Sequence, residues 1–457
     1  MKKFIRPRTF RGILLAFCGL FILPLALGAC GDNVPVISEV PDNRPKLNPA
    51  DYPPILFVHG SGDQASNWIR TRWFFESNAY PAERLFTISF RYPTAPFDGN
   101  NPGKAYTDND GQRSQLAAKV DEVLAKTGAK KLALIANSRG GLTIRNYLER
   151  GGGASKVSHI ILGGTPNHGV MDVPLIIPGN EFNASGDFQK DLNGRDEVVP
   201  GVDTMTIRSD TYDKYAQPRS LASPIAIGYR GPELKGALNL VLAGLDHRET
   251  AYHPRAFAQM YRFITGVAPR TTEVTPEANP RIGGLMTGYE DGVQTNIGVS
   301  GVKVSIFEVD STTGQRKGIA VHEAVTGTDG SWGNFVGRPD AYYEFVAQPP
   351  NLPEYHFFRT PFPRSTELAN FRLQPEKVEP GKVLVVFTRP RGFISNSRDK
   401  HLLDGKPVPG VDDGVPTTSA FKVDFSGPER SVPASLNGES MTIRTVNGAI
   451  VFAEFTN

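Results

Sequence analysis

The stretch that decides the fold is Lys131-Leu-Ala-Leu-Ile-Ala-Asn-Ser-Arg-Gly-Gly-Leu-Thr-Ile-Arg-Asn-Tyr-Leu148. Its apolar run Leu132–Ala136 predicts a buried parallel strand. A helix is predicted directly after it, because apolar residues recur there at helical spacing: Leu142, Ile144, Tyr147 and Leu148. Between the two elements, Ser138 stands at a turn whose neighbours two positions away, Ala136 and Gly140, are both small.

Small neighbours let a strand and a helix approach closely around a serine in a strained backbone conformation. The sequence follows the pattern G-x-S-x-G, with Ala136 in place of the first glycine. The hydroxyl of Ser138 would lie at a helix N-terminus, where aligned N–H groups favour a developing negative charge. Ser138 is therefore a candidate nucleophile; the alternative is an ordinary serine in a glycine-rich turn.

Strands and helices alternate on both sides of this stretch. The predicted strands are Ile55–Val58, Leu85–Phe90, Val157–Leu162, Met205–Ile207 and Leu238–Leu242, and the predicted helices are Ser66–Glu76, Gln115–Lys126 and Pro254–Phe263. Such alternation predicts an α/β domain over residues 53–270, built on a doubly wound, mostly parallel sheet.

A serine needs a base and an orienting carboxylate to act as a nucleophile. His247 follows the last predicted strand of this sheet, and Asp210 and Asp213 both follow the strand before it. These segments begin at strand C-termini, the same sheet edge as Ser138, where open α/β sheets place their sites. The spacing leaves both aspartates open as the acid.

A glycine-rich turn, His59-Gly-Ser-Gly62, follows the first predicted strand. We expect the backbone N–H of Ser61 and that of Arg139, the residue after the candidate nucleophile, to form an oxyanion hole. His59 precedes the nucleophile in a buried turn, so a structural role is expected for it.

The N-terminal segment, residues 1–30, is predicted to be an export signal. It has a cationic start (Lys2, Lys3, Arg6, Arg8 and Arg11), then an apolar stretch, then Leu27-Gly-Ala-Cys30. The last four residues resemble a lipobox, in which Cys30 would be lipidated and become the mature N-terminus. Gly31 after it favours the outer membrane of a bacterial cell envelope. A single membrane-spanning helix is the alternative, and residues 31–52 are expected to be an extended tether.

The charge and the cysteine content indicate which kinds of ligand or partner are not expected. The formal net charge of +3 does not indicate nucleic-acid binding. Cys18 and Cys30 are the only cysteines, so removal of the signal would leave one, with no disulfide and no cysteine-based metal site. We expect no cofactor and no bound metal.

The C-terminal part is predicted to be all β. Alternating runs such as Val302–Val309 and Tyr342–Ala347 indicate half-buried strands. Two sandwich modules are expected, over residues 275–372 and 373–457, with no part in the chemistry. Aromatic residues from Trp332 to Phe345 are expected to be sandwich core, the alternative being a surface that holds an acyl chain.

Residues 53–267 resemble the α/β-hydrolase fold of bacterial lipases and carboxylesterases. The resemblance is carried by His59-Gly-Ser-Gly62, Ala136-Asn-Ser-Arg-Gly-Gly141, Gly164-Thr-Pro-Asn-His-Gly169, the Asp-x-x-x-Gln-Pro segment ending at Pro218, and Asp246-His247. It implies that Asp213 is the acid and that His168 is structural. Residues Gly283 to Ala347 are similar to transthyretin-like or carboxypeptidase-regulatory-like β modules, which implies binding or support.

The expected function is that of a lipid-anchored serine hydrolase with the triad Ser138, Asp213 and His247, whose substrate is a carboxylic ester or lipid. Hydrolysis of a polyhydroxyalkanoate or other polyester, or acyl transfer, remains an alternative on the same site. A surface-binding lipoprotein without activity is an alternative of a different class.

Overall fold

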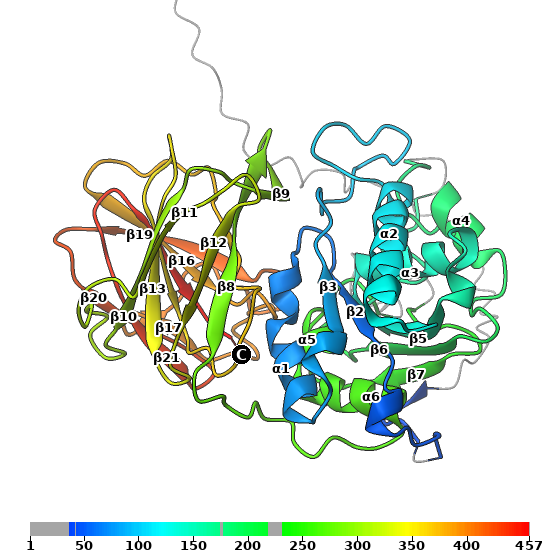
Figure 1. Cartoon of the computed structure of the whole chain (residues 1–457). Helices are drawn as coiled ribbons and strands as arrows, with labels where there is room; N and C mark the ends of the chain where they lie inside the picture. Colours follow the sequence, from blue (N-terminus) through cyan, green and yellow to red (C-terminus); the bar gives the residue numbers. More distant parts are fainter. Residues whose placement is uncertain (1–35, 42, 174–176, 218–230, 457) are drawn as a thin grey trace, which may run out of the picture. The chain divides into compact units, whose positions relative to one another are not determined.

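The computed structural model describes residues 36–41, 43–173, 177–217 and 231–456 (Figure 1). Residues 34–457 group into one compact unit. The predicted export signal, the lipobox with Cys30 and residue Pro218 lie outside the described residues. No helix within the described ranges is long and apolar enough to cross a membrane.

The N-terminal half contains a parallel sheet with helices on both faces. Its strands are β1 (Val36–Ile37), β2 (Ile55–Val58), β3 (Leu85–Ile88), β4 (Leu132–Asn137), β5 (Val157–Gly163), β6 (Asp203–Arg208) and β7 (Leu238–Val241). Among the described residues they pair in the order β1-β7-β6-β5-β4-β2-β3, and every pairing is parallel. The predicted α/β fold class is confirmed.

The helices of this half are α1 (Ile69–Ser77), α2 (Asn109–Thr127), α3 (Arg139–Arg150), α4 (Asp187–Asn193), α5 (Glu249–Tyr252) and α6 (Pro254–Thr265). Short 3-10 turns lie at Pro49–Asp51, Ala65–Trp68, Ala82–Arg84 and Gly153–Ser155. Residues of β2 alternate between two cores: Ile55 and Phe57 pack with α1 and α6, whereas Leu56 and Val58 pack with α2 and α3. This alternation is the period-two pattern of a strand covered on both faces.

The described part of the expected tether is packed on the sheet. Strand β1 pairs in parallel with the edge strand β7, and Val40 is buried in the core beside α6. The backbone N–H of Leu47 donates to the carbonyl of Thr265 at 2.9 Å. The prediction of an extended tether is therefore wrong for these residues, because the apolar side chains between the prolines reach the core.

The C-terminal half consists of strands and loops. Its strands are β8 (Arg281–Glu290), β9 (Val293–Gly298), β10 (Lys303–Val309), β11 (His322–Val325), β12 (Ser331–Val336), β13 (Tyr342–Gln348), β14 (Tyr355–Arg359), β15 (Phe371–Arg372), β16 (Lys382–Thr388), β17 (His401–Leu403), β18 (Lys406–Pro407), β19 (Ala420–Ser426), β20 (Ser431–Leu436), β21 (Glu439–Arg444) and β22 (Ile450–Glu454). The expected all-β character is confirmed.

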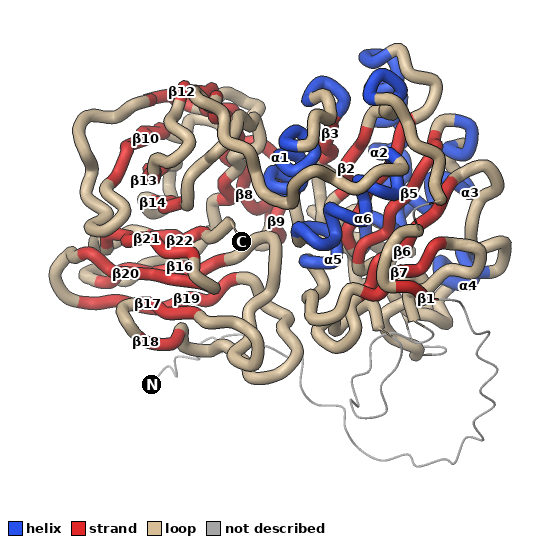
Figure 2. Tube along the Cα trace, turned by 90° about the horizontal axis from the view of Figure 1, so that it is seen from below, coloured by secondary structure: helices blue, strands red, loops and turns tan. Residues whose placement is uncertain are grey.

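One sheet runs through both of the modules that the sequence predicts. In the described chain its order is β11-β10-β13-β14-β22-β16-β19, and β22 pairs in parallel with both β14 and β16 (Figure 2). The boundary expected at residues 372–373 therefore does not separate two sandwiches. Strand β22, from the end of the chain, is inserted beside a strand of the first predicted module, and no sequence pattern indicates this pairing.

The aromatic run in this half is core. Trp332, Phe335, Tyr343 and Phe345 are all buried in one cluster with strands β8, β10 and β13. They are not available to hold an acyl chain, so the alternative function for these residues is wrong.

Candidate active site

Ser138 lies in the tight turn between β4 and α3. Its backbone has φ 52° and ψ −125°, a strained conformation for a residue with a side chain. A Cβ on Gly140 would lie 2.7 Å from the carbonyl oxygen of His59 and 2.8 Å from that of Val58. Glycine is therefore required where α3 passes the end of β2, as the sequence pattern predicts.

His247 is held by one of the two candidate acids. Its Nδ1 lies 2.9 Å from Oδ1 of Asp213. The same oxygen accepts hydrogen bonds from the backbone N–H of Tyr215 at 2.7 Å and of Ala216 at 3.0 Å. Asp210 is exposed, and its carboxylate accepts instead from the backbone N–H of Gly244 at 2.9 Å. The structure thus brings Asp213, and not Asp210, to the histidine.

The serine turn and the histidine turn are tied directly to each other. The amide nitrogen of Asn137, the residue before Ser138, donates to the carbonyl of His247 at 3.1 Å and to that of Gly163 at 3.2 Å. The hydroxyl of Thr250 donates to the same carbonyl of His247 at 2.8 Å. Sequence reasoning missed the role of Asn137, because position x in G-x-S-x-G has no fixed residue type.

Ser138 and His247 line one cavity of about 390 Å³. Its other lining residues are Ser61, Asp63, Asn137, Pro166, Val170, Met171, Phe182, Tyr215, Arg248 and Phe393. The exposed surface of the walls is mainly apolar, and a smaller number of polar groups lie among the apolar and aromatic side chains. This combination is typical of a site for a small organic ligand.

The two expected oxyanion donors flank the serine. Gly60 is so close to it that an added Cβ would lie 3.2 Å from Cβ of Ser138. Ser61 follows, and Arg139 is the first residue of α3. Ser61 lines the same cavity as Ser138, and the hydroxyl oxygen of Ser61 accepts the backbone N–H of Ala95 at 3.2 Å.

The side chain of Arg139 has a separate, structural role. It is fully buried and forms a two-point ion pair with Glu181, with Nη2 at 2.8 Å from Oε2. Glu181 belongs to the segment that also supplies the wall residues Val170, Met171 and Phe182. On the sequence alone, Val173–Pro178 and Asp187–Asn193 could form either a lid over the site or an ordinary αβ crossover. The structure forms helix α4 at Asp187–Asn193, and residues 174–176 lie outside the described ranges.

The other two histidines near the site have structural partners. His59 is buried, accepts the backbone N–H of Phe90 at Nε2 (3.1 Å) and donates from Nδ1 to the carbonyl of Gly60 (2.8 Å). Burial lowers the pKa of His59 to about 4, so the ring is neutral. His168 contacts the carbonyl of Gly231 at 2.7 Å and Glu197 at 2.8 Å. Neither is placed as the base.

The C-terminal half reaches this cavity, although no sequence pattern predicts that it takes part in the site. Phe393 forms part of the wall. Arg248, next to His247, donates to the carbonyl of Pro390 at 2.7 Å and pairs with Asp63. Arg372 donates to the carbonyl of Gly62 at 2.8 Å, behind the glycine-rich turn. No local pattern of residues indicates these long-range contacts.

In the part of the chain that the structure describes, no group of three or more His, Cys, Asp or Glu side chains could hold a metal ion.

Two family models match the chain. Residues 53–216 match the alpha/beta hydrolase fold, and residues 281–376 match the lipase C-terminal domain. The second match covers the region expected to be transthyretin-like.

Solved structures with a similar fold include three hydrolases. Aspergillus fumigatus lipase B is 19% identical over 49% of this chain and 55% of its own length, with a TM-score of 0.36. The match thus spans about half of that lipase. A Bacillus licheniformis lipase in its propeptide form is 15% identical over 90% of this chain and 96% of its own, with a TM-score of 0.34. The Bacillus subtilis carboxylesterase CesB is 13% identical over 49% of this chain and 87% of its own, with a TM-score of 0.28.

Proposed function

We propose that this chain, which joins an alpha/beta hydrolase fold to a lipase C-terminal domain, is a serine hydrolase of carboxylic esters. One observation carries the proposal: His247 is held by Asp213 at 2.9 Å, and it lines the same cavity as the strained Ser138. A serine, an imidazole and a buried carboxylate in this relation are what nucleophilic acyl transfer requires.

In the proposed mechanism, Ser138 attacks the ester carbonyl and His247 accepts the hydroxyl proton at Nε2, because Nδ1 is bound to Asp213. Asp213 stabilises the imidazolium that forms. The N–H groups of Ser61 and Arg139 stabilise the oxyanion; loss of one such donor costs about 100- to 1000-fold in rate. The alcohol leaves with the proton from His247, and water then hydrolyses the acyl-enzyme.

The cavity walls favour an uncharged, apolar ester. Val170, Met171 and Phe182 supply apolar surface to the lining, and Tyr215 and Phe393 supply further aromatic surface. A volume of about 390 Å³ is in the range of pockets that hold small organic ligands. We therefore expect esters of short to medium acyl chains to be the substrates that fit entirely inside.

The nucleophile is tested by Ser138→Ala, with Ser114→Ala as the matched control on the exposed face of α2. We expect Ser138→Ala to lose p-nitrophenyl ester turnover by at least about 1000-fold, whereas Ser114→Ala keeps it. A fluorophosphonate probe should label Ser138 in the wild-type protein and in the control. Full turnover by Ser138→Ala, or labelling of a different serine, would refute the proposal.

We further propose that the protein is exported and anchored in the cell envelope through a lipid on Cys30. The support is the sequence Leu27-Gly-Ala-Cys30 after a cationic and an apolar segment. Cys30→Ser should move the protein from the membrane to the soluble fraction, measured by fractionation and by mass spectrometry of the N-terminus. Retention of Cys30→Ser in the membrane would support an uncleaved helical anchor instead.

A further inference from the structure

A residue of the C-terminal half lies against the candidate base. The ring of Phe393 is nearly parallel to that of His247, with an angle of 11° and a centroid distance of 6.2 Å. Tyr215 contacts the imidazole as well, at 4.9 Å and 64°. Of the described residues that line the cavity, Phe393 alone comes from the half after residue 275. The ring is therefore part of the wall of the cavity that an ester bound at Ser138 would occupy.

Asp246, the residue before His247, connects the histidine turn to the segment that carries Phe393. Its side chain is fully buried. Oδ1 accepts the backbone N–H groups of Arg248 at 2.8 Å and Glu249 at 2.9 Å, which closes the turn. Oδ2 accepts the backbone N–H of Phe393 at 2.7 Å and a guanidinium N–H of Arg398 at 2.9 Å. One carboxylate thus fixes the turn and the segment relative to each other.

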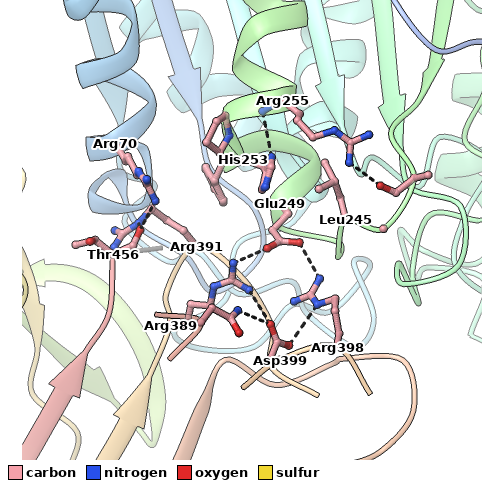
Figure 3. A pocket seen from close by; sticks show the side chains of 15 residues that line it. Arg70, Leu245, Glu249, His253, Arg255, Arg389, Arg391, Arg398, Asp399 and Thr456 are labelled. Carbon is pink, nitrogen blue, oxygen red and sulfur yellow. Dashed lines mark hydrogen bonds and ion pairs between the residues drawn. The ribbon is translucent and has the colours of Figure 1, made fainter. Parts of the chain in front are cut away.

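Two arginines of this segment extend the connection (Figure 3). Arg398 donates to Glu249 at 2.7 Å and to the carbonyl of Phe393 at 2.7 Å, and Arg389 pairs with the other oxygen of Glu249. Asp399 lies 3.3 Å from Nε of Arg398. Burial opposes the charge of Arg398, but the neighbouring carboxylates raise its pKa, so it stays charged. The contacts are directional and leave the turn little freedom.

We infer that residues 389–400, the loop between β16 and β17, complete the active site from the C-terminal half. Phe393 is a specificity-determining residue that limits the size of the ester, and Arg398 is a positioning residue that holds the His247 turn through Asp246. The inference rests on the proposed function of Ser138. The chemistry selected by the ring is an uncharged ester with an apolar group next to the imidazole.

The specificity part is tested with Phe393→Ala. The matched control is Phe421→Ala, because both rings are 8% exposed but Phe421 packs in the β core. Removing the ring of Phe393 enlarges the cavity, so the ratio of kcat/KM for a bulky ester to that for the acetate should rise by at least about 10-fold. Phe421→Ala should leave the ratio unchanged. An unchanged ratio in Phe393→Ala would overturn the inference for this residue.

The positioning part is tested with Arg398→Gln and Arg398→Lys. We expect kcat of Arg398→Gln to fall about 10- to 100-fold while KM changes less than about twofold, since a displaced imidazole transfers the proton poorly without weakening ester binding. Arg398→Lys, which keeps the charge, should recover part of kcat. The control is Arg359→Gln, which removes another buried ion pair of the β half, with Glu454 at 2.7 Å.

The outcomes for the arginine variants support or overturn the positioning role of Arg398. An unchanged kcat in folded Arg398→Gln, or an equal loss in Arg359→Gln, would overturn the positioning role. If Arg398→Gln does not fold, as checked by circular dichroism, Arg398→Lys decides: kcat below wild type at unchanged KM and melting temperature supports the role, and wild-type kcat overturns it. Absence of turnover and of Ser138 labelling in the wild-type protein would instead refute the proposed function itself.

Discussion

At the scale of single residues, backbone hydrogen bonds decide which aspartate serves the histidine. Asp213 and Asp210 lie in one short loop, and the sequence alone leaves both open. The loop folds back so that Oδ1 of Asp213 accepts from two backbone N–H groups and from His247. Asp210 is turned toward the backbone of Gly244. The choice depends on loop conformation, which residue spacing does not encode; only the family resemblance favoured Asp213.

Asp213→Asn should therefore be far more damaging than Asp210→Asn. An amide cannot stabilise the imidazolium form of His247 and selects the wrong tautomer, so kcat should fall by about 10⁴-fold. Asp210→Asn keeps an oxygen for the N–H of Gly244, and we expect less than about a threefold change. Both are measured as kcat on a short p-nitrophenyl ester. A severe Asp210→Asn and a mild Asp213→Asn would reverse the assignment.

His59 makes stability depend on pH. Its pKa is about 4 in the folded protein and about 6.5 when unfolded. As pH falls, the unfolded chain therefore binds the proton first. The contribution of neutral His59 to the free energy of unfolding is complete above pH 6.5, declines between pH 6.5 and pH 4, and does not fall further below pH 4. The loss is at most about 3 kcal/mol.

We expect His59→Gln, which cannot titrate, to lack this part of the decline. The free energy of unfolding, measured by urea titration between pH 7.5 and pH 4, should fall more steeply in the wild type. The variant keeps a residual slope, because burial also lowers the pKa of His159 to about 4. Parallel curves for the two proteins would show that folding does not lower the pKa of His59 and would contradict this account.

At the scale of elements, the local residue pattern predicts the bounds of those strands and helices whose own residues specify them. Strands β2 and β4 were predicted almost to the residue, because continuous apolar runs between turn signals specify buried strands. Helix α2 begins earlier than its apolar spacing indicates, at Asn109, because the side chain of Asp108 caps it by accepting from the N–H of Gly111. The turn at Ser138 between β4 and α3 was predictable because the close approach of strand and helix requires small residues on either side of the serine.

Gly140→Ala tests that packing. Alanine favours helix by about 1 kcal/mol over glycine, but the added Cβ would meet two backbone carbonyls, of Val58 and His59, which cannot rotate away. We expect a net destabilisation of about 1–3 kcal/mol and a lower kcat, because the displaced turn carries the N–H of Ser61. Gly318→Ala, where the added atom meets open space, is the control. Unfolding midpoints and kcat that match the wild type would contradict this account.

At the scale of the molecule, contacts between residues that are distant in the chain could not be predicted from the sequence. No sequence pattern pairs Arg398 with Asp246, which are 152 residues apart; only the tertiary fold brings them together in a buried network. The same holds for β22, whose alternation predicts a strand but not its neighbours β14 and β16. The alternation of apolar residues determines which face of a strand is buried, but it does not determine which strand pairs with it.

Interrupting β22 should consequently damage the site in the other half. Val451→Pro removes a backbone N–H from a fully buried strand that is paired on both sides, whereas Val325→Pro alters the edge strand β11. We expect Val451→Pro to lose most ester turnover and to unfold at lower urea, and Val325→Pro to be much milder. Retention of full turnover in Val451→Pro would mean that the α/β half is active without an intact β half, as expected from the sequence.

The position of β22 also affects the order in which parts of the protein can fold. It follows all other described strands along the chain, yet it pairs between β14 and β16 rather than at an edge. The sheet cannot close until this strand has arrived, and contacts between such distant segments form slowly. In the folding chain, Ser138, Asp213 and His247 can therefore come together long before the loop after β16 is locked against them. On refolding from urea, ester cleavage at full rate should be one of the last signals to recover.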